Sequence, residues 1–327
     1  IKPLLVCLVI FTLSSLACAL SPNVWSFVFF RLLQGLSAAG GIVLTRSIAC
    51  DRFKGNELTS FMSFLMAINS FGPILGPIVG SLVVTYFAWQ VIFFILVGWG
   101  LILIYLTKFH VPESLAEAKR EKSALISILK MKTDLLNLKF MLTVLSLSFV
   151  MGGFFSYLAA SPFVFQKVYG FTPIEYSFTF AFIAISISII ASSAGRLSRR
   201  LSELKVVIIA YVLLLISGIG VLIISLVQPE SFVPILGCLA IYCAMMGLSQ
   251  SAGFGVVMSF KKGGAGSASG IFGVMYFLIG SLVSPLVGVM GELSMIPFGI
   301  NLSVCAILAI VFLYFAVRIK DENNSED

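Results

Sequence analysis

Arg31 is the basic residue whose charge falls well inside a long apolar run, residues 23–46. It lies about eight residues into that run, or about 12 Å at the 1.5 Å rise per residue of a helix. A charge at the centre of a bilayer costs about 2.5–3.5 kcal/mol even on lenient insertion scales, so such a residue is functional by default. Gln34 and Gly35 follow at i+3 and i+4 and share its helical face. The pattern predicts a functional charge inside a membrane.

The chemistry open to Arg31 depends on what can face it. No acidic residue lies deep in any apolar run, so Arg31 needs a water-filled cavity or a carboxylate from elsewhere. The alternative is that its methylenes are buried while the charge snorkels to the outer interface. The only histidine, His110, lies at an expected helix end before Pro112. Without buried acids or histidines, intramembrane proteolysis and metal catalysis lose their bases and ligands, so we expect no enzyme, no metal site and no cofactor.

A second signal is the run of glycine and proline between residues 72 and 80. Gly72, Gly76 and Gly80 recur every four residues, which places them on one stripe of a helix where a neighbouring backbone can approach closely. Pro73 and Pro77 remove two backbone donors and favour a bend. Together they predict a smooth, kinked contact useful where two helix bundles rock against each other. Static close packing is the alternative interpretation.

Other polar and adaptable side chains within apolar runs are candidates for a substrate cavity. They are Gln34, Tyr157, Gln250 and Met246. Methionine and the 30 phenylalanines would supply an adaptable apolar wall. For each of these residues, helix packing or lipid contact is the alternative role.

Composition sets the class of protein that must position these residues. Of the 327 residues, 59% are hydrophobic and 11% are charged, and the mean hydropathy is +1.10. A soluble domain carries about 25% charged residues, so a soluble enzyme is nearly excluded. Disordered and collagen-like chains are excluded as well. We therefore expect an all-α polytopic membrane protein.

Ten runs are long enough to cross a bilayer, which takes about 20 apolar residues per helix. They are residues 3–20, 23–46, 58–84, 89–108, 140–166, 174–195, 204–227, 232–259, 267–290 and 296–317. With ten spans, all but two of the 21 basic residues fall on one side, the exceptions being Lys167 and the intramembrane Arg31. Because basic loops stay in the cytoplasm, both termini are predicted to be cytoplasmic. The net charge of +7 thus reflects topology and not nucleic-acid binding.

The long polar stretch divides the chain. We expect an N-terminal bundle over 1–108, a cytoplasmic central loop over 109–139, a six-helix C-terminal bundle over 140–317 and a cytoplasmic tail over 318–327. Apolar residues within the loop fit a helix lying at the interface, and a flexible linker is the equal alternative.

The two halves also repeat short motifs. Residues 76–80, Gly-Pro-Ile-Val-Gly, match residues 284–288, Ser-Pro-Leu-Val-Gly, and the tripeptide Gly-Leu-Ser occurs at both 35–37 and 247–249. Both matches lie six spans apart, which predicts a duplicated six-span unit of the kind from which transporters are built. Twelve spans are then expected, and the chain, which begins with Ile1, is expected to lack the first two.

These motifs resemble a known family. Arg31-Leu32-Leu33-Gln34-Gly35 resembles the RxxxG motif of helix four in the major facilitator superfamily, and Gly72-Pro73-x-x-Gly76-Pro77-x-x-Gly80 resembles the helix-five antiporter motif of its drug:proton exporters. The stretch 161–166, Ser-Pro-Phe-Val-Phe-Gln, followed by Tyr169-Gly170, resembles helix seven of the Bcr/CflA drug-resistance subfamily.

The resemblance implies helices three to twelve of a two-bundle carrier in the bacterial inner membrane. It implies proton-coupled export of amphiphilic drugs by alternating access, with Arg31 tuning a proton site whose carboxylate commonly lies on helix one, outside this chain. The partners implied are a small-molecule substrate, protons and the lipid bilayer, and a monomer is expected. The alternatives are a metabolite exporter, such as one for amino acids or sugars, and a non-transporting truncated remnant.

Overall fold

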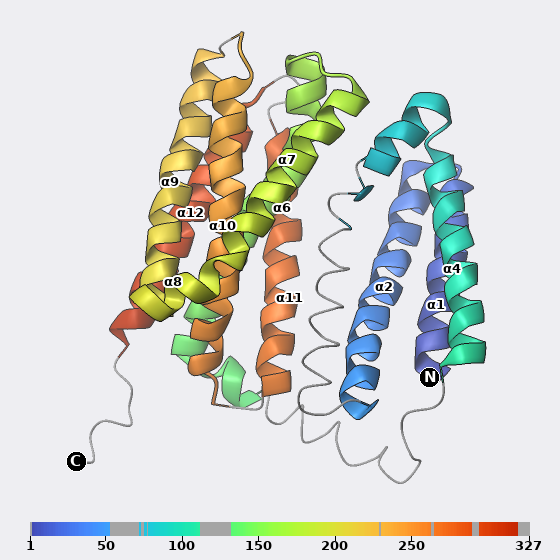
Figure 1. Ribbon diagram of the computed structural model, residues 1–327, viewed down its shortest axis with the longest axis horizontal. Coiled ribbons are helices and arrows are strands. Elements are labelled where there is room, and N and C mark those ends of the chain that lie inside the picture. Colours follow the sequence, from blue (N-terminus) through green and yellow to red (C-terminus); the bar gives the residue numbers. More distant parts are fainter. Residues whose placement is uncertain are drawn as a thin grey trace. The chain divides into compact units, whose positions relative to one another are not determined.

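A computed structural model describes residues 2–52, 72, 75–76, 78–111, 132–228, 230–262, 265–289 and 294–319. The chain divides into two compact units, Ile1–Glu121 and Lys122–Asp327, and each is considered by itself (Figure 1). The described residues of the first unit form α1 (Lys2–Ala19), α2 (Val24–Arg52) and α4 (Gln90–His110).

The second unit contains longer and more numerous helices. They are α6 (Leu138–Phe163), the π-helical turn η2 (Val164–Val168), α7 (Pro173–Ser192), α8 (Ala194–Leu201), α9 (Glu203–Val227), α10 (Val233–Ser259), α11 (Ala265–Val283), the 3-10 turn η3 (Ser284–Gly288) and α12 (Ile296–Arg318). Across the described ranges all regular structure is helical. The predicted all-α architecture is confirmed.

Eight stretches of the described chain are long and apolar enough to cross a membrane. They match eight of the ten expected spans. The expected span 23–46 is a continuous helix within the 29-residue α2 but lies outside that set. Of the expected span 58–84, residues 78–86 are helical and most of the rest lies outside the described residues.

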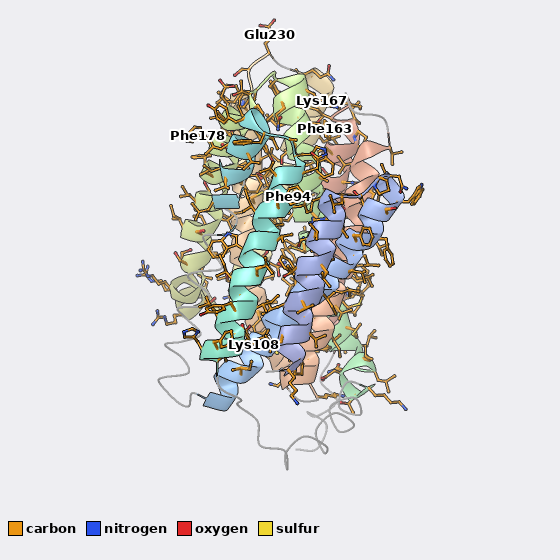
Figure 2. All side chains as sticks on the ribbon, turned by 90° about the vertical axis from the view of Figure 1, so that its right-hand side faces the viewer. Phe94, Lys108, Phe163, Lys167, Phe178 and Glu230 are labelled. Carbon is orange, nitrogen blue, oxygen red and sulfur yellow. The ribbon has the colours of Figure 1, made fainter. Side chains whose placement is uncertain are left out.

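Large apolar side chains cover the outside of both units. Phe94 on α4 is 46% exposed and Phe178 on α7 is 66% exposed (Figure 2). Exposed apolar surface on this scale is unfavourable in water and favourable in hydrocarbon. Lys167 and Glu230 lie together at one end of the C-terminal unit (Figure 2), as expected for the side of the membrane with few basic residues.

Local sequence explains where the helices begin. The Asn23 side chain accepts a hydrogen bond from the Ser26 amide at 2.8 Å and so caps α2, since asparagine is favoured at this position. The start of α7 is a capping box in which Thr172 and Glu175 each satisfy the other's backbone amide, with Pro173 in the first turn.

The two halves pack their corresponding helices in the same way. In the first unit α1 packs against both α2 and α4, and in the second unit α9 packs against both α10 and α12. Under the repeat predicted from the sequence, α1, α2 and α4 correspond to α9, α10 and α12. The shared pairing supports duplication of one structural unit.

Helix α6 is the centre of the C-terminal unit, because it packs against α10, α11 and α12. Its Ser146 hydroxyl bonds the Tyr211 hydroxyl of α9 at 2.8 Å and donates to the Ala309 carbonyl of α12 at 2.7 Å. Hydrogen bonds between helices are the polar contribution to packing where no water is present.

The segment that leads into α6 is fixed to the turn after α10. Asp134 is fully buried and accepts a hydrogen bond from the Lys262 amide at 3.0 Å. Asn137 caps α6 and donates to the Phe260 carbonyl at 2.6 Å. The end of the expected central loop is therefore folded onto the C-terminal unit. The interfacial helix proposed for the rest of that loop lies almost wholly outside the described residues.

Helices α9 and α12 approach so closely that their backbones touch at two glycines. A Cβ atom at Gly299 would lie 2.5 Å from the Leu222 Cα atom, and one at Gly218 would lie 3.2 Å from the Ser303 nitrogen. Glycine is needed at Gly299, because a side chain there would push the helices apart, and the contact at Gly218 is tight.

We predict that Gly299→Ala destabilises the protein, whereas Gly237→Ala in α10 does not. A Cβ at Gly237 would meet nothing within 4 Å. Overpacking costs about 1–3 kcal/mol, whereas alanine in an open helical position gains up to about 1 kcal/mol over glycine. Thermal unfolding of the purified variants in detergent measures the difference. Equal midpoints for the two variants would contradict the backbone contact.

Candidate functional site

Arg31 is held by one partner on its own helix and one on α4. Its Nη1 donates to Gln34 Oε1 at 2.7 Å, and the guanidinium lies over the Phe93 ring, 5.8 Å from its centroid. These are the i+3 bond expected from the spacing and a cation–π contact. Arg31 is exposed within the N-terminal unit, whereas Gln34 is 3% exposed.

Gln34 links Arg31 to the neighbouring helix α1. Its Nε2 donates to the Ser15 hydroxyl of α1 at 2.6 Å, and that hydroxyl donates to the Phe11 carbonyl at 2.6 Å. Ser15 is fully buried. We refer to Arg31, Gln34 and Ser15 as the Arg31 relay.

The direction of the relay is fixed by its charged end. A guanidinium can only donate, so the Gln34 oxygen must face Arg31. The amide nitrogen then faces Ser15 as a donor, and the hydroxyl proton goes to the Phe11 carbonyl. The orientations of the Gln34 amide and the Ser15 hydroxyl are thereby fixed, and Arg31 is held by one hydrogen bond and one cation–π contact.

An apolar aromatic cluster lies beside the relay. The rings of Phe27, Trp89 and Phe93 meet edge to face with centroids 5.6–5.9 Å apart, a favoured geometry for aromatic pairs. Phe93 also packs with Cys18 of α1. An apolar wall lowers the local dielectric, which strengthens the field of the arginine charge.

The acidic residues of the described chain lie at helix ends or in turns. They are Asp51, Asp134, Glu175, Glu203 and Glu230. In the described part of the chain no three His, Cys, Asp or Glu residues are grouped as a metal site would need. The described site is thus a fixed positive charge held by neutral hydrogen-bond partners.

The other expected cavity residues belong to the C-terminal unit. Tyr157 is 1% exposed and stacks on Phe180 of α7, with centroids 5.8 Å apart. Met246 is 5% exposed and belongs to the same core. Gln250 is half-buried, and its Nε2 donates to the Leu147 carbonyl of α6 at 2.9 Å. Within its own unit each of these residues packs helices together. Helix packing is the alternative to a cavity role that the sequence left open.

The segment resembling helix seven ends in an irregular turn. Pro162 lies in the last turn of α6, and the chain continues as the π-helical η2. Gly170 has φ +72°, a left-handed conformation that favours glycine. Tyr169 packs on Phe165, and burial raises the pKa of Tyr169 above its ordinary value. Among the described residues its hydroxyl has no hydrogen-bond partner.

The glycine and proline stripe is only partly described. A Cβ at Gly72, Gly76 or Gly80 would meet nothing within 4 Å in the described structure. Pro73 and Pro77 lie outside the described residues.

Sequence reasoning found Arg31 and Gln34 but missed Ser15 and Phe93. Serine is common in apolar helices, and neighbouring Ser14 is also buried yet bonds only carbonyls of its own helix, Ile10 and Phe11. Nothing in the residue types separates the two serines. Which of the two serines contacts Gln34 depends on the way α1 crosses α2.

Comparison with known proteins decides the family. Residues 1–285 match the model of the Major Facilitator Superfamily. The chain belongs to the Major Facilitator Superfamily. It is 33% identical over 327 residues to the uncharacterized MFS-type transporter YdgK of Bacillus subtilis (strain 168), a match covering 99% of this chain and 81% of that protein.

Two further similarities agree with membership of this superfamily. It is 23% identical to the bicyclomycin resistance protein homolog of Haemophilus influenzae (strain ATCC 51907 / DSM 11121 / KW20 / Rd), over 90% of this chain and 74% of that protein. The crystal structure of a bacterial homolog of the human lysosomal transporter Spinster has a TM-score of 0.67 at 13% identity, covering 96% of this chain and 81% of that one. The protein is thus a membrane transporter of small molecules, with the fold of that superfamily.

We predict that Ser15→Ala destabilises this superfamily member more than Ser14→Ala. Ser15→Ala removes the acceptor of the buried Gln34 amide, and leaving such a donor unpaired costs about 1–3 kcal/mol. Ser14→Ala removes only bonds within α1. Thermal unfolding in detergent compares the two. If the two variants unfold at the same temperature, the bond between the helices contributes nothing.

Proposed function

We propose that the protein exports amphiphilic drugs across the bacterial inner membrane in exchange for protons, by alternating access. The Arg31 relay is the observation that carries the proposal, because it holds a permanent charge within an apolar helix pair. Similarity to a bicyclomycin resistance protein homolog supports drugs as the substrate class.

Arg31 acts through its field and not by titrating. Arginine keeps its proton at every physiological pH, so it cannot itself be the proton carrier. A positive charge nearby stabilises the ionised form of a carboxyl group and lowers its pKa. Arg31 would set the pH at which a carboxyl group of the proton pathway loads and releases its proton. The resemblance to drug:proton exporters implies that this carboxyl group lies on the family's first helix.

The relay holds the guanidinium charge that produces this field. Ser15 holds the Gln34 amide, and the amide holds the guanidinium. An amide positions the arginine without neutralising it, whereas a carboxylate at the same place would cancel its charge. The effect on a nearby carboxyl group therefore depends on the whole relay and not on Arg31 alone.

Alternating access is supported by the duplicated packing. The triplets α1–α2–α4 and α9–α10–α12 pair alike, as expected for two related bundles that rock around a central site. The stripe of Gly72, Gly76 and Gly80 would provide a close moving helix contact. Pro73 and Pro77 would bend this helix and so help to restrict leak.

The proposed orientation has both termini in the cytoplasm. It follows from the basic residues, which the ten-span topology gathers on one side of the membrane. We further propose that the protein works as a monomer.

We predict that Arg31→Gln shifts the pH dependence of efflux upward and lowers its rate. Loss of the positive charge raises the pKa of the coupling carboxyl group, so that group stays protonated at a higher pH. We expect a shift of about one pH unit or more, given the 1–3 units that a close arginine produces. Uptake of a fluorescent lipophilic cation into inverted membrane vesicles, in which the exporter's cytoplasmic face is outside, is measured between pH 5.5 and 9 and gives the profile.

Arg31→Lys and Lys205→Gln are the controls for this experiment. Arg31→Lys keeps the charge but loses the guanidinium geometry, so its profile should fall between those of the wild type and Arg31→Gln. Lys205→Gln removes an exposed charge from the first turn of α9 and should leave the profile unchanged. Unaltered proton-driven efflux in Arg31→Ala would exclude the assigned role.

The substrate class is tested by competition in the same vesicles. We predict that lipophilic cations and other amphiphilic drugs compete with the fluorescent cation, whereas amino acids and sugar phosphates do not. The expected reason is an adaptable apolar wall, which binds by area and shape and offers few polar contacts. Competition by a hydrophilic metabolite alone would establish a metabolite exporter instead.

A further inference from the structure

Helix α8 carries an arginine cluster that the proposed transport cycle does not use. Arg196, Arg199 and Arg200 lie within its eight residues, and all three are exposed. They line a hollow of about 450 Å³ together with Ser193 and Leu197.

The cluster is built by the turn between two helices. The amides of Arg196 and Leu197 both donate to the Ser193 carbonyl at 3.0 Å, which starts α8 directly after α7. Ser193, Arg196 and Arg200 are spaced at i, i+3 and i+7, which places them on one face of the helix. Ser202 then takes φ +72° and ends the helix before α9. The arginines are thus fixed at the end of an apolar span.

The charges of the cluster are available to an external anion. Arg199 Nε donates to the Gly195 carbonyl of its own helix at 3.2 Å. Glu203, the nearest acid along the described chain, has its carboxylate against Gly255 of α10. No ion pair neutralises these arginines in the described part of the unit.

We infer that this arginine cluster binds the phosphate of an anionic phospholipid. Helix α7 is an apolar span that continues into α8, so the cluster lies at the depth where lipid headgroups begin. The planar guanidinium fork matches phosphate oxygens in a bidentate way that a lysine cannot. Anionic lipids attract basic residues at such positions. Leu197 supplies an apolar wall beside the charges, as contact with a lipid requires.

The test is lipid binding to the purified full chain in detergent, measured by native mass spectrometry with phosphatidylglycerol and phosphatidylcholine. The variant is Arg196→Gln/Arg200→Gln, and the control is Lys205→Gln/Lys261→Gln, which removes the same charge outside the hollow. From the contribution of each basic residue, the arginine variant should bind phosphatidylglycerol roughly 30-fold more weakly. The lysine variant should bind it as the wild type does, and phosphatidylcholine binding should not change in either.

Three results would overturn the inference. Equal losses in the arginine and lysine variants would show general charge attraction, and a matching loss of phosphatidylcholine would show a site that does not read the headgroup. Displacement of phosphatidylglycerol by millimolar inorganic phosphate would show a site for free anions. None of these measurements depends on transport, so a failure here is distinct from a failure of the proposed efflux. Because the arginines are exposed, circular dichroism and elution volume should match the wild type in both variants.

Discussion

A polar group inside hydrocarbon has no water to bond, so the protein must complete its hydrogen bonds. Serines show the simplest solution. Ser148, Ser225 and Ser303 each donate to the carbonyl four residues earlier, at 2.7–2.9 Å, so the hydroxyl is satisfied within one helix. Where a hydroxyl bonds a second helix instead, it fixes how the two helices pack. Ser146 does this in the C-terminal unit and Ser15 does it in the N-terminal unit.

Arg31 is the most demanding case of this constraint, because its charge must be stabilised without being cancelled. A carboxylate partner would stabilise it best, but the pair would then be neutral and exert little field on a third group. The side-chain oxygen of Gln34 accepts a hydrogen bond from the guanidinium, and its side-chain nitrogen donates one to the Ser15 hydroxyl. Phe93 adds a cation–π contact that also leaves the charge in place. The arrangement therefore keeps a net positive charge, which is what control of a proton-binding group requires.

The sequence predicts this fold well because its strongest signals are local. Span length and the placing of Arg31 and Gln34 on one helical face depend on residues within one helix. Ser15 could not be predicted, since Ser14 beside it has the same type and similar burial, and only the crossing of α1 and α2 separates them. Tyr157 and Met246 remain predicted cavity residues. Their residue types suit a cavity, but which face of α6 or α10 turns toward the core of the unit depends on packing that no single helix encodes.

The repeat separates what the scaffold needs from what the chemistry needs. Helices α2 and α10 correspond. Helix α2 packs against α1, and α10 packs against α9, the counterpart of α1. The counterpart of Arg31 in α10 is Cys243, a fully buried and uncharged residue. Packing of this helix triplet therefore does not require a charge, and the cost of keeping Arg31 in an apolar span must be offset by something other than stability. Under the proposed function that offset is coupling to protons, for which the first half keeps a charge and the second half has an uncharged, buried residue at the corresponding position.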